Sequence, residues 1–126
     1  MTTKSLTAPV DFPGTLPEWL VFRELTRLGE EFEYQSSKLG GRQERGGVVV
    51  DFWIADRNLA LNVASQYWHY GRPEGILNDK LQREALLAMG LEIIYLDEEA
   101  LLRNARYYVE AALRGEDYSR MARGLQ

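Results

Sequence analysis

The 126-residue sequence predicts one α/β domain in which helices flank a mixed β-sheet. Two observations carry this prediction. Residues 48–54 are apolar on both faces and rich in β-branched side chains, as in a buried central strand. Amphipathic segments with helix-capping residues lie before and after that run. We expect an extended N-terminal arm at 1–14, the domain at 15–115 and a C-terminal tail at 116–126.

The first helix begins at a capping box. Thr15 is followed three residues later by Glu18, with a proline in the first turn. Apolar residues then recur at helical spacing as far as Gly29, where the helix should end.

A three-stranded meander should follow this helix. We expect strands at 31–36, 48–54 and 59–65, joined by a polar loop at 37–45 and a turn at 55–58. If the second hairpin is symmetric about Asp56 and Arg57, Asp51 lies opposite Asn62. By strand alternation, Asp51 should then share a face with Trp53.

The second half of the domain is predicted as helix, strand, helix, at 75–89, 91–96 and from Asp97 to Gly115. Gly90 and Gly115 are expected to end the two helices, and Asp97 to cap the second. The apolar stripes are predicted to be Leu77, Leu81, Ala85 and Ala88 on the first helix and Leu102, Ala105, Val109 and Leu113 on the second.

Composition excludes several kinds of site. The chain has no cysteine and one histidine, which removes disulfides, thiolate zinc sites and multi-histidine metal sites. A net charge of -4 argues against a protein that coats nucleic acid nonspecifically, but not against a nuclease whose carboxylates hold metal. We find no signal-peptide or membrane-span pattern, so we expect no membrane partner and a cytoplasmic location, in a bacterium or a host cell.

Asp51 is the residue that most needs an explanation, because a carboxylate is costly to desolvate among large apolar side chains. Two acidic groups opposite each other, with a third on a packed helix, suit Mg²⁺ bound to a phosphate. Here the second position is Asn62, an amide, so the metal site would be weak.

Several segments occur in an order that resembles a known superfamily. They are Pro17-Glu18-Trp19, Val50-Asp51-Phe52, the strand 61–65, His69 and the basic helix 79–90. This order resembles the PD-(D/E)XK superfamily, and within it proteins similar to very short patch repair endonucleases, over roughly residues 15–97. The resemblance implies a restriction-endonuclease-like core and Mg²⁺- or Mn²⁺-dependent hydrolysis of DNA. The motif glutamate appears as Asn62 and the position two residues later as Ala64.

The resemblance also implies roles for individual residues. Metal ligands would be Asp51, Asn62 and Glu18. The catalytic set would add Gln66, His69 and Lys80. On the basic helix of the resemblance, Arg83 would contact nucleic acid. Independently of the resemblance, Lys38, Arg42 and Arg45 flank a glycine pair and would suit contacts to backbone phosphates, and Tyr67 would stack on a base.

Structural roles explain the same residues without chemistry. Glu18 can close the capping box, and Asn62 can serve only to satisfy Asp51. His69 and Tyr67 can pack among aromatic side chains, and the charged loop can simply be solvated.

Three hypotheses therefore stand. The first is a metal-dependent DNA endonuclease. The second is a catalytically inactive nucleic-acid-binding or protein-binding module of the same fold, such as an accessory protein of a phage or mobile element. The third is an assembly subunit that self-associates.

Overall fold

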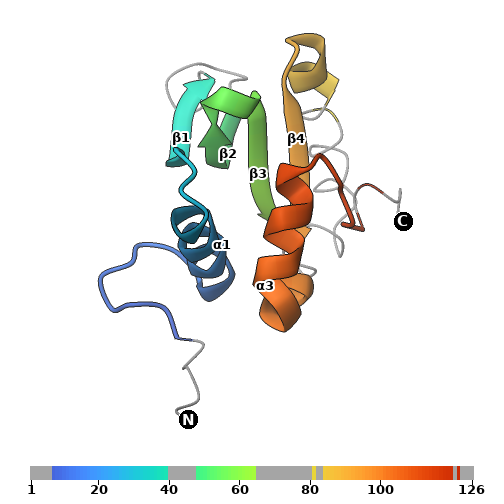
Figure 1. Cartoon of the computed structure of the whole chain (residues 1–126). Helices are drawn as coiled ribbons and strands as arrows, with labels where there is room; N and C mark the ends of the chain where they lie inside the picture. Colours follow the sequence, from blue (N-terminus) through green and yellow to red (C-terminus); the bar gives the residue numbers. More distant parts are fainter. Residues whose placement is uncertain (1–6, 40–47, 65–80, 82–83, 121, 123–126) are drawn as a thin grey trace.

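The computed structural model describes residues 7–39, 48–64, 81, 84–120 and 122. Its elements, in chain order, are α1 (Leu16–Arg27), β1 (Glu33–Leu39), β2 (Val48–Ile54), the short 3-10 helix η1 (Ala55–Arg57), β3 (Leu59–Ala64), β4 (Glu92–Asp97) and α3 (Glu98–Leu113). Residues 84–88 are helical, within the helix predicted at 75–89. The mixed α/β architecture is thus confirmed (Figure 1).

The four strands form one sheet in the order β1-β2-β3-β4. The first three strands are antiparallel neighbours, and β4 runs parallel to β3. The predicted hairpin register is confirmed where the strands pair, with Phe52 opposite Leu61 and Trp53 opposite Ala60. Asn58 permits the tight connection because it adopts the left-handed conformation, with φ of 49°.

Both faces of the sheet are covered by apolar side chains. Helices α1 and α3 lie side by side on one face and bury the larger cluster (Figure 1). A smaller cluster on the other face includes Trp53, Tyr95 and Leu86. In the described part of the chain, no helix has the length and apolar character needed for a membrane span.

Several predicted details are wrong, each for a local reason. Strand β1 continues through Leu39, into the predicted loop, because backbone pairing with β2 satisfies its polar groups whatever the side chains. In α3, Leu101 is buried and Leu102 is exposed, because either leucine can share a helical face with Ala105 and packing on the sheet selects Leu101. In the helical turns before β4, Leu86 is buried while Leu81 is exposed.

The predicted stripe there also included Ala85 and Ala88, and both are exposed. The larger Leu86 side chain takes the buried place instead. Gly90 ends these turns as predicted, with φ of 80°.

Asp97 occupies the N-cap position of α3, but its carboxylate does not cap the helix. Its Oδ2 accepts a hydrogen bond from the Arg120 backbone N–H at 3.0 Å. Asp117 Oδ2 accepts from the Tyr95 N–H of β4 at 3.2 Å. These bonds hold residues 117–120 against β4. The Asp97 carboxylate therefore binds this segment and does not accept a hydrogen bond from the first turn of α3.

Candidate active site where α1 meets β2 and β3

Asp51 and Asn62 are joined where the β2–β3 ladder ends. The Asp51 N–H donates to Asn62 Oδ1, and the Val63 N–H donates to Asp51 Oδ2, both at 2.8 Å. Each side chain therefore satisfies the backbone of the opposite strand. The pair predicted from hairpin symmetry is present, and it holds the Asp51 carboxylate in a fixed position.

The backbone around Asp51 is irregular. Val50 and Trp53 contribute to the same buried cluster, although residues three apart on a regular strand face opposite sides. On the neighbouring strand, Gln35 has φ of 53°, in a region that a non-glycine residue seldom adopts. Strict alternation, on which the prediction that Asp51 shares a face with Trp53 depended, therefore does not hold here. Such irregular backbone is concentrated at functional sites.

Glu18 reaches toward the sheet from the first turn of α1. It closes the predicted capping box, since its Oε1 accepts from the Thr15 N–H at 2.8 Å and Thr15 Oγ1 accepts from the Glu18 N–H at 3.3 Å. The same Oε1 accepts from the Tyr34 hydroxyl at 3.0 Å. One carboxylate thus caps α1 and also binds the Tyr34 hydroxyl of β1.

Tyr34 links this helix to the Asp51 region. Burial raises the pKa of Tyr34, and the negative charges of Glu18 and Asp51 raise it further. The hydroxyl therefore stays protonated, as a donor, at any ordinary pH. Glu18 acts on this hydroxyl through a hydrogen bond and Asp51 acts on it only through its charge, and we take the region around the three residues as the candidate site.

Residues 9–14 form a strap over Glu18 and Tyr34. The Phe12 ring lies 5.2 Å from the Tyr34 ring and 5.3 Å from the Trp19 ring. A Cβ added at Gly14 would overlap the Tyr34 hydroxyl and Glu18 Oε1. Only a glycine lets the strap approach this closely.

The donor set suits a hard cation held weakly. Mg²⁺ is commonly held by one or two carboxylates together with water and substrate oxygens. Asp51 and Glu18 supply two carboxylates, and each carboxylate has about four lone-pair sites on its two oxygens. In the described ranges no three residues of the His, Cys, Asp and Glu types form a cluster suited to a metal. The third ligand predicted from the sequence is the amide of Asn62.

The remaining sequence predictions for the site are not tested. Lys38 lies in β1, where the structure describes its backbone but not its side chain. The other predicted residues lie outside the described residues: Gln66, His69, Lys80, Arg42, Arg45, Tyr67 and Arg83.

Sequence reasoning missed Tyr34 and Gly14. Tyr34 lay within a predicted strand, but nothing local showed that its hydroxyl reaches α1, 16 residues earlier. The adjacent Gln35 gave no signal either, because a polar residue next to an aromatic one is ordinary in a half-buried strand.

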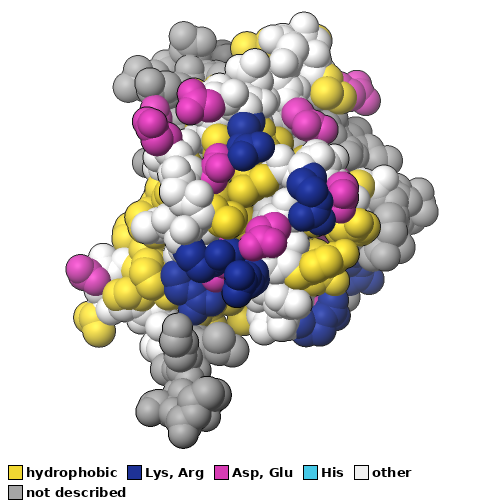
Figure 2. All heavy atoms as spheres, in the orientation of Figure 1, with side chains coloured by type: hydrophobic (Ala, Val, Ile, Leu, Met, Phe, Trp, Pro, Cys, Tyr) yellow, Lys and Arg dark blue, Asp and Glu magenta, His cyan; other side chains and the backbone are white. Residues whose placement is uncertain are grey.

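The face built by α1 and α3 is not a basic surface. Figure 2 shows Lys and Arg side chains interspersed with acidic ones on that side. Arg27 contacts Glu24 at 2.7 Å and Glu110 at 2.8 Å, and Arg106 lies 3.5 Å from Glu110. These contacts lower the pKa of Glu110, chiefly through the Arg27 hydrogen bond. Here the positive charges are neutralised within the protein.

Comparison with solved structures finds a domain of similar fold. The catalytic domain of the homing endonuclease I-Bth0305I superposes with a TM-score of 0.58 over 78% of this chain and 93% of that domain, at 18% sequence identity. No protein-family model and no curated protein matches the sequence. At this identity the likeness establishes a shared fold.

Proposed function

We propose that this protein is a metal-dependent DNA endonuclease of the PD-(D/E)XK type, with Asp51 at the centre of its active site. One observation carries the proposal. Glu18 on α1 accepts a hydrogen bond from the Tyr34 hydroxyl, and the charge of Asp51 on β2 helps to raise the pKa of the same hydroxyl, in a fold shared with a homing endonuclease's catalytic domain.

Asp51 and Glu18 would hold Mg²⁺ or Mn²⁺, with the Asn62 amide as a neutral third ligand. The cation would supply Lewis acidity at the scissile phosphate. The chain's own residues fix the two carboxylates. The Val63 N–H holds Asp51, and the Tyr34 hydroxyl holds Glu18.

The test is cleavage of supercoiled plasmid and of branched or mismatched DNA with Mg²⁺ or Mn²⁺. We expect metal-dependent nicking by the native chain and at least a hundredfold loss in Asp51→Asn. Asparagine removes the charge but keeps an oxygen that can accept from Val63, so the fold should survive. Asp56→Asn, at an exposed acid in η1, is the matched control and should cleave like the native chain. Equal cleavage by Asp51→Asn would refute the role of Asp51.

A second candidate is the inactive module of the same fold, and one observation favours it. Asn62 Oδ1 already accepts the Asp51 N–H, and the buried Ala64 occupies the position where the resemblance implies a polar catalytic residue. Asn62→Asp discriminates between the two, because it adds a carboxylate beside Asp51. If the site binds metal, Mn²⁺ affinity measured by calorimetry should rise. No Mn²⁺ binding by the native chain or the variant would favour the inactive module.

A further inference from the structure

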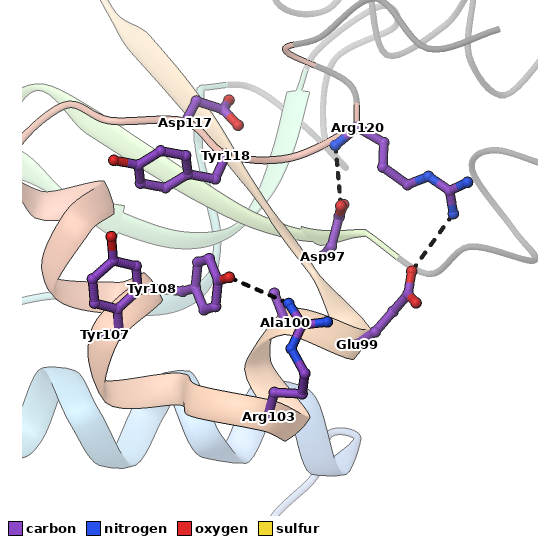
Figure 3. Close-up of a pocket in the computed structure, with 9 residues that line it drawn as sticks. All are labelled: Asp97, Glu99, Ala100, Arg103, Tyr107, Tyr108, Asp117, Tyr118 and Arg120. Carbon is purple, nitrogen blue, oxygen red and sulfur yellow. Dashed lines mark hydrogen bonds and ion pairs between the residues drawn. The ribbon is translucent and has the colours of Figure 1, made fainter.

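A groove of about 740 Å³ lies between α3 and residues 117–120, at the far edge of β4 (Figure 3). Its volume falls in the range of sites that bind small molecules. The groove is lined by three tyrosines, two arginines, three acids and Ala100. None of these residues belongs to the candidate active site.

The tyrosines present aromatic surface to solvent. Tyr107 and Tyr118 are 48% and 49% exposed, and their rings lie 6.3 Å apart with an interplanar angle of 24°. Tyr108 lies edge-on to both, at 5.0 and 6.2 Å. Exposed rings held by one another form a rigid platform on which a flat ligand can stack.

Two arginines flank this platform. Arg103 donates to the Tyr108 hydroxyl at 3.2 Å, and its guanidinium lies 6.0 Å from the centre of that ring. Because the Tyr108 side chain is uncharged, these contacts orient Arg103 without neutralising it. Arg120, on the opposite wall, lies 3.5 Å from Glu99.

The acids of the groove have two different roles. Asp97 and Asp117 accept backbone N–H groups and so fix the wall formed by residues 117–120. Glu99 has a side chain that is 54% exposed. A carboxylate there can accept hydrogen bonds from the amino or imino groups at the edge of a nucleobase.

The helix itself is broken beside the groove. Asn104 has φ of -161° and ψ of 74°, and its Oδ1 accepts from the Tyr107 N–H at 3.1 Å, so that the helix restarts there. Figure 3 shows the ribbon departing from a helical path between Arg103 and Tyr107. Such a break costs stability and recurs where a surface is shaped for function.

We propose that this groove binds one unpaired nucleotide of a DNA strand, with its base stacked on the tyrosine platform and its phosphate facing Arg103. With three acids against two arginines, the lining carries a net charge of about -1, which disfavours the closely spaced phosphates of a duplex. Stacking on aromatic rings supplies affinity for a single base.

This inference rests on the proposed function for its substrate class, and the position of the groove fits it. Asp97, at the groove, pairs with Ala64 of β3, two residues beyond Asn62. From residue rise and strand spacing, the backbones of Asn62 and Asp97 are roughly 8 Å apart. A single DNA strand can therefore contact both sites.

The experiment measures fluorescence anisotropy of a labelled eight-nucleotide single strand, and of its duplex, in EDTA. We expect the native chain to bind the single strand more tightly than the duplex. Replacing Tyr107 and Tyr118 by leucine keeps apolar bulk but removes the rings, and should weaken binding at least tenfold. Replacing both by phenylalanine keeps the rings and should preserve most of the affinity. Arg103→Gln should weaken binding and flatten its salt dependence.

Native-like binding by the leucine variant would overturn the inference, as would absence of single-strand binding by the native chain. Far-UV circular dichroism and thermal unfolding establish that each variant is folded. Should the leucine variant unfold, Arg103→Gln decides the question alone, and unchanged affinity and salt slope would refute the proposal. Asp51→Asn should bind the strand normally but not cleave. Failure of catalysis is therefore distinguishable from failure of the groove.

Discussion

Tyr34 is the side chain through which α1 and the sheet meet at the candidate active site. Phenylalanine at this position would keep the ring contacts with Phe12 and Phe52 but would remove the donor to Glu18. We expect Tyr34→Phe to lower kcat and Mn²⁺ affinity by roughly tenfold, because groups that orient metal ligands commonly contribute this much. The free energy of unfolding should fall by only about 1 kcal/mol.

The matched control for Tyr34→Phe is Thr26→Val, which removes from α1 a hydroxyl that donates to the Phe22 carbonyl, outside the site. This control should leave kcat and Mn²⁺ affinity unchanged. If Tyr34→Phe lowered stability while leaving both quantities intact, the Tyr34 hydroxyl would be structural only.

The sequence identified a candidate site residue where its side chain is unlike those of its neighbours along the chain. Asp51 stood out because an acid in an apolar strand needs partners, and the hairpin register identified Asn62 as the nearest. Tyr34 did not stand out, because a tyrosine suits a half-buried strand whether or not its hydroxyl has a function. Its partner lies on another element, and no local pattern encodes that contact.

The strap and α1 make a prediction at the scale of elements. An alanine at Gly14 would place its Cβ against the Tyr34 hydroxyl and Glu18 Oε1, and 2.8 Å from the Phe12 ring. We expect Gly14→Ala to lower the free energy of unfolding by about 1–3 kcal/mol, as overpacking usually does. Pro13→Ala, at the exposed neighbour, is the control. Tyr34→Phe removes the hydroxyl with which the new Cβ clashes. The double variant should therefore lose less free energy of unfolding than the sum of the losses in the two single variants.

The end of α1 is tied to the hairpin by one ion pair. Arg57 of η1 contacts both carboxylate oxygens of Glu30, at 2.9 and 3.0 Å, and also donates to the Leu113 carbonyl of α3. The Arg57 hydrogen bonds lower the pKa of Glu30. A depressed pKa stabilises the fold above the ordinary value near 4.5, and this contribution is lost as the pH falls through the folded value.

Glu30→Gln should therefore unfold at lower urea concentration than the native chain at pH 7, and the difference should shrink as the pH falls below about 4.5. Glu31→Gln is the control, because Glu31 is its exposed neighbour. A difference in midpoint that stays constant from pH 7 to pH 3 would show that the ion pair has no part in it.

Helix α3 shows where prediction from periodicity stops. Ala105 and Val109 are buried as predicted, because the spacing of 3.6 residues holds after Asn104. The buried stripe begins at Leu101 and not at Leu102, and Leu101, Ala105 and Val109 keep helical spacing. Periodicity allows either leucine to precede Ala105, by three or four residues, and packing against the sheet selects one of them.

The topology of the whole molecule was predictable because each element carries its own signal in sequence. Capping residues, a two-faced apolar strand and helix-ending glycines fix the order of elements, and that order leaves few ways to form one sheet. What sequence did not predict are contacts between distant segments. Asp97 with Arg120, and Tyr95 with Asp117, build a groove that no motif indicated.

The charge of the whole molecule leads to a last prediction, about how it meets DNA. With a net charge of -4, and with Arg27 of α1 and Arg106 of α3 paired to acids, the protein has little capacity to displace counterions from a duplex. We therefore expect duplex binding to be weak in EDTA and to strengthen when Ca²⁺ is present at Asp51 and Glu18. The slope of log affinity against log salt should be roughly -2 to -3, corresponding to two or three phosphate contacts.

Asp51→Asn should lose the Ca²⁺-dependent increase in duplex affinity while keeping the weak binding seen in EDTA, and Asp56→Asn should keep both. Tight duplex binding in EDTA, with a much steeper dependence of log affinity on log salt, would contradict this prediction. It would show that basic residues bind the DNA and that the Asp51 and Glu18 carboxylates are not needed for binding.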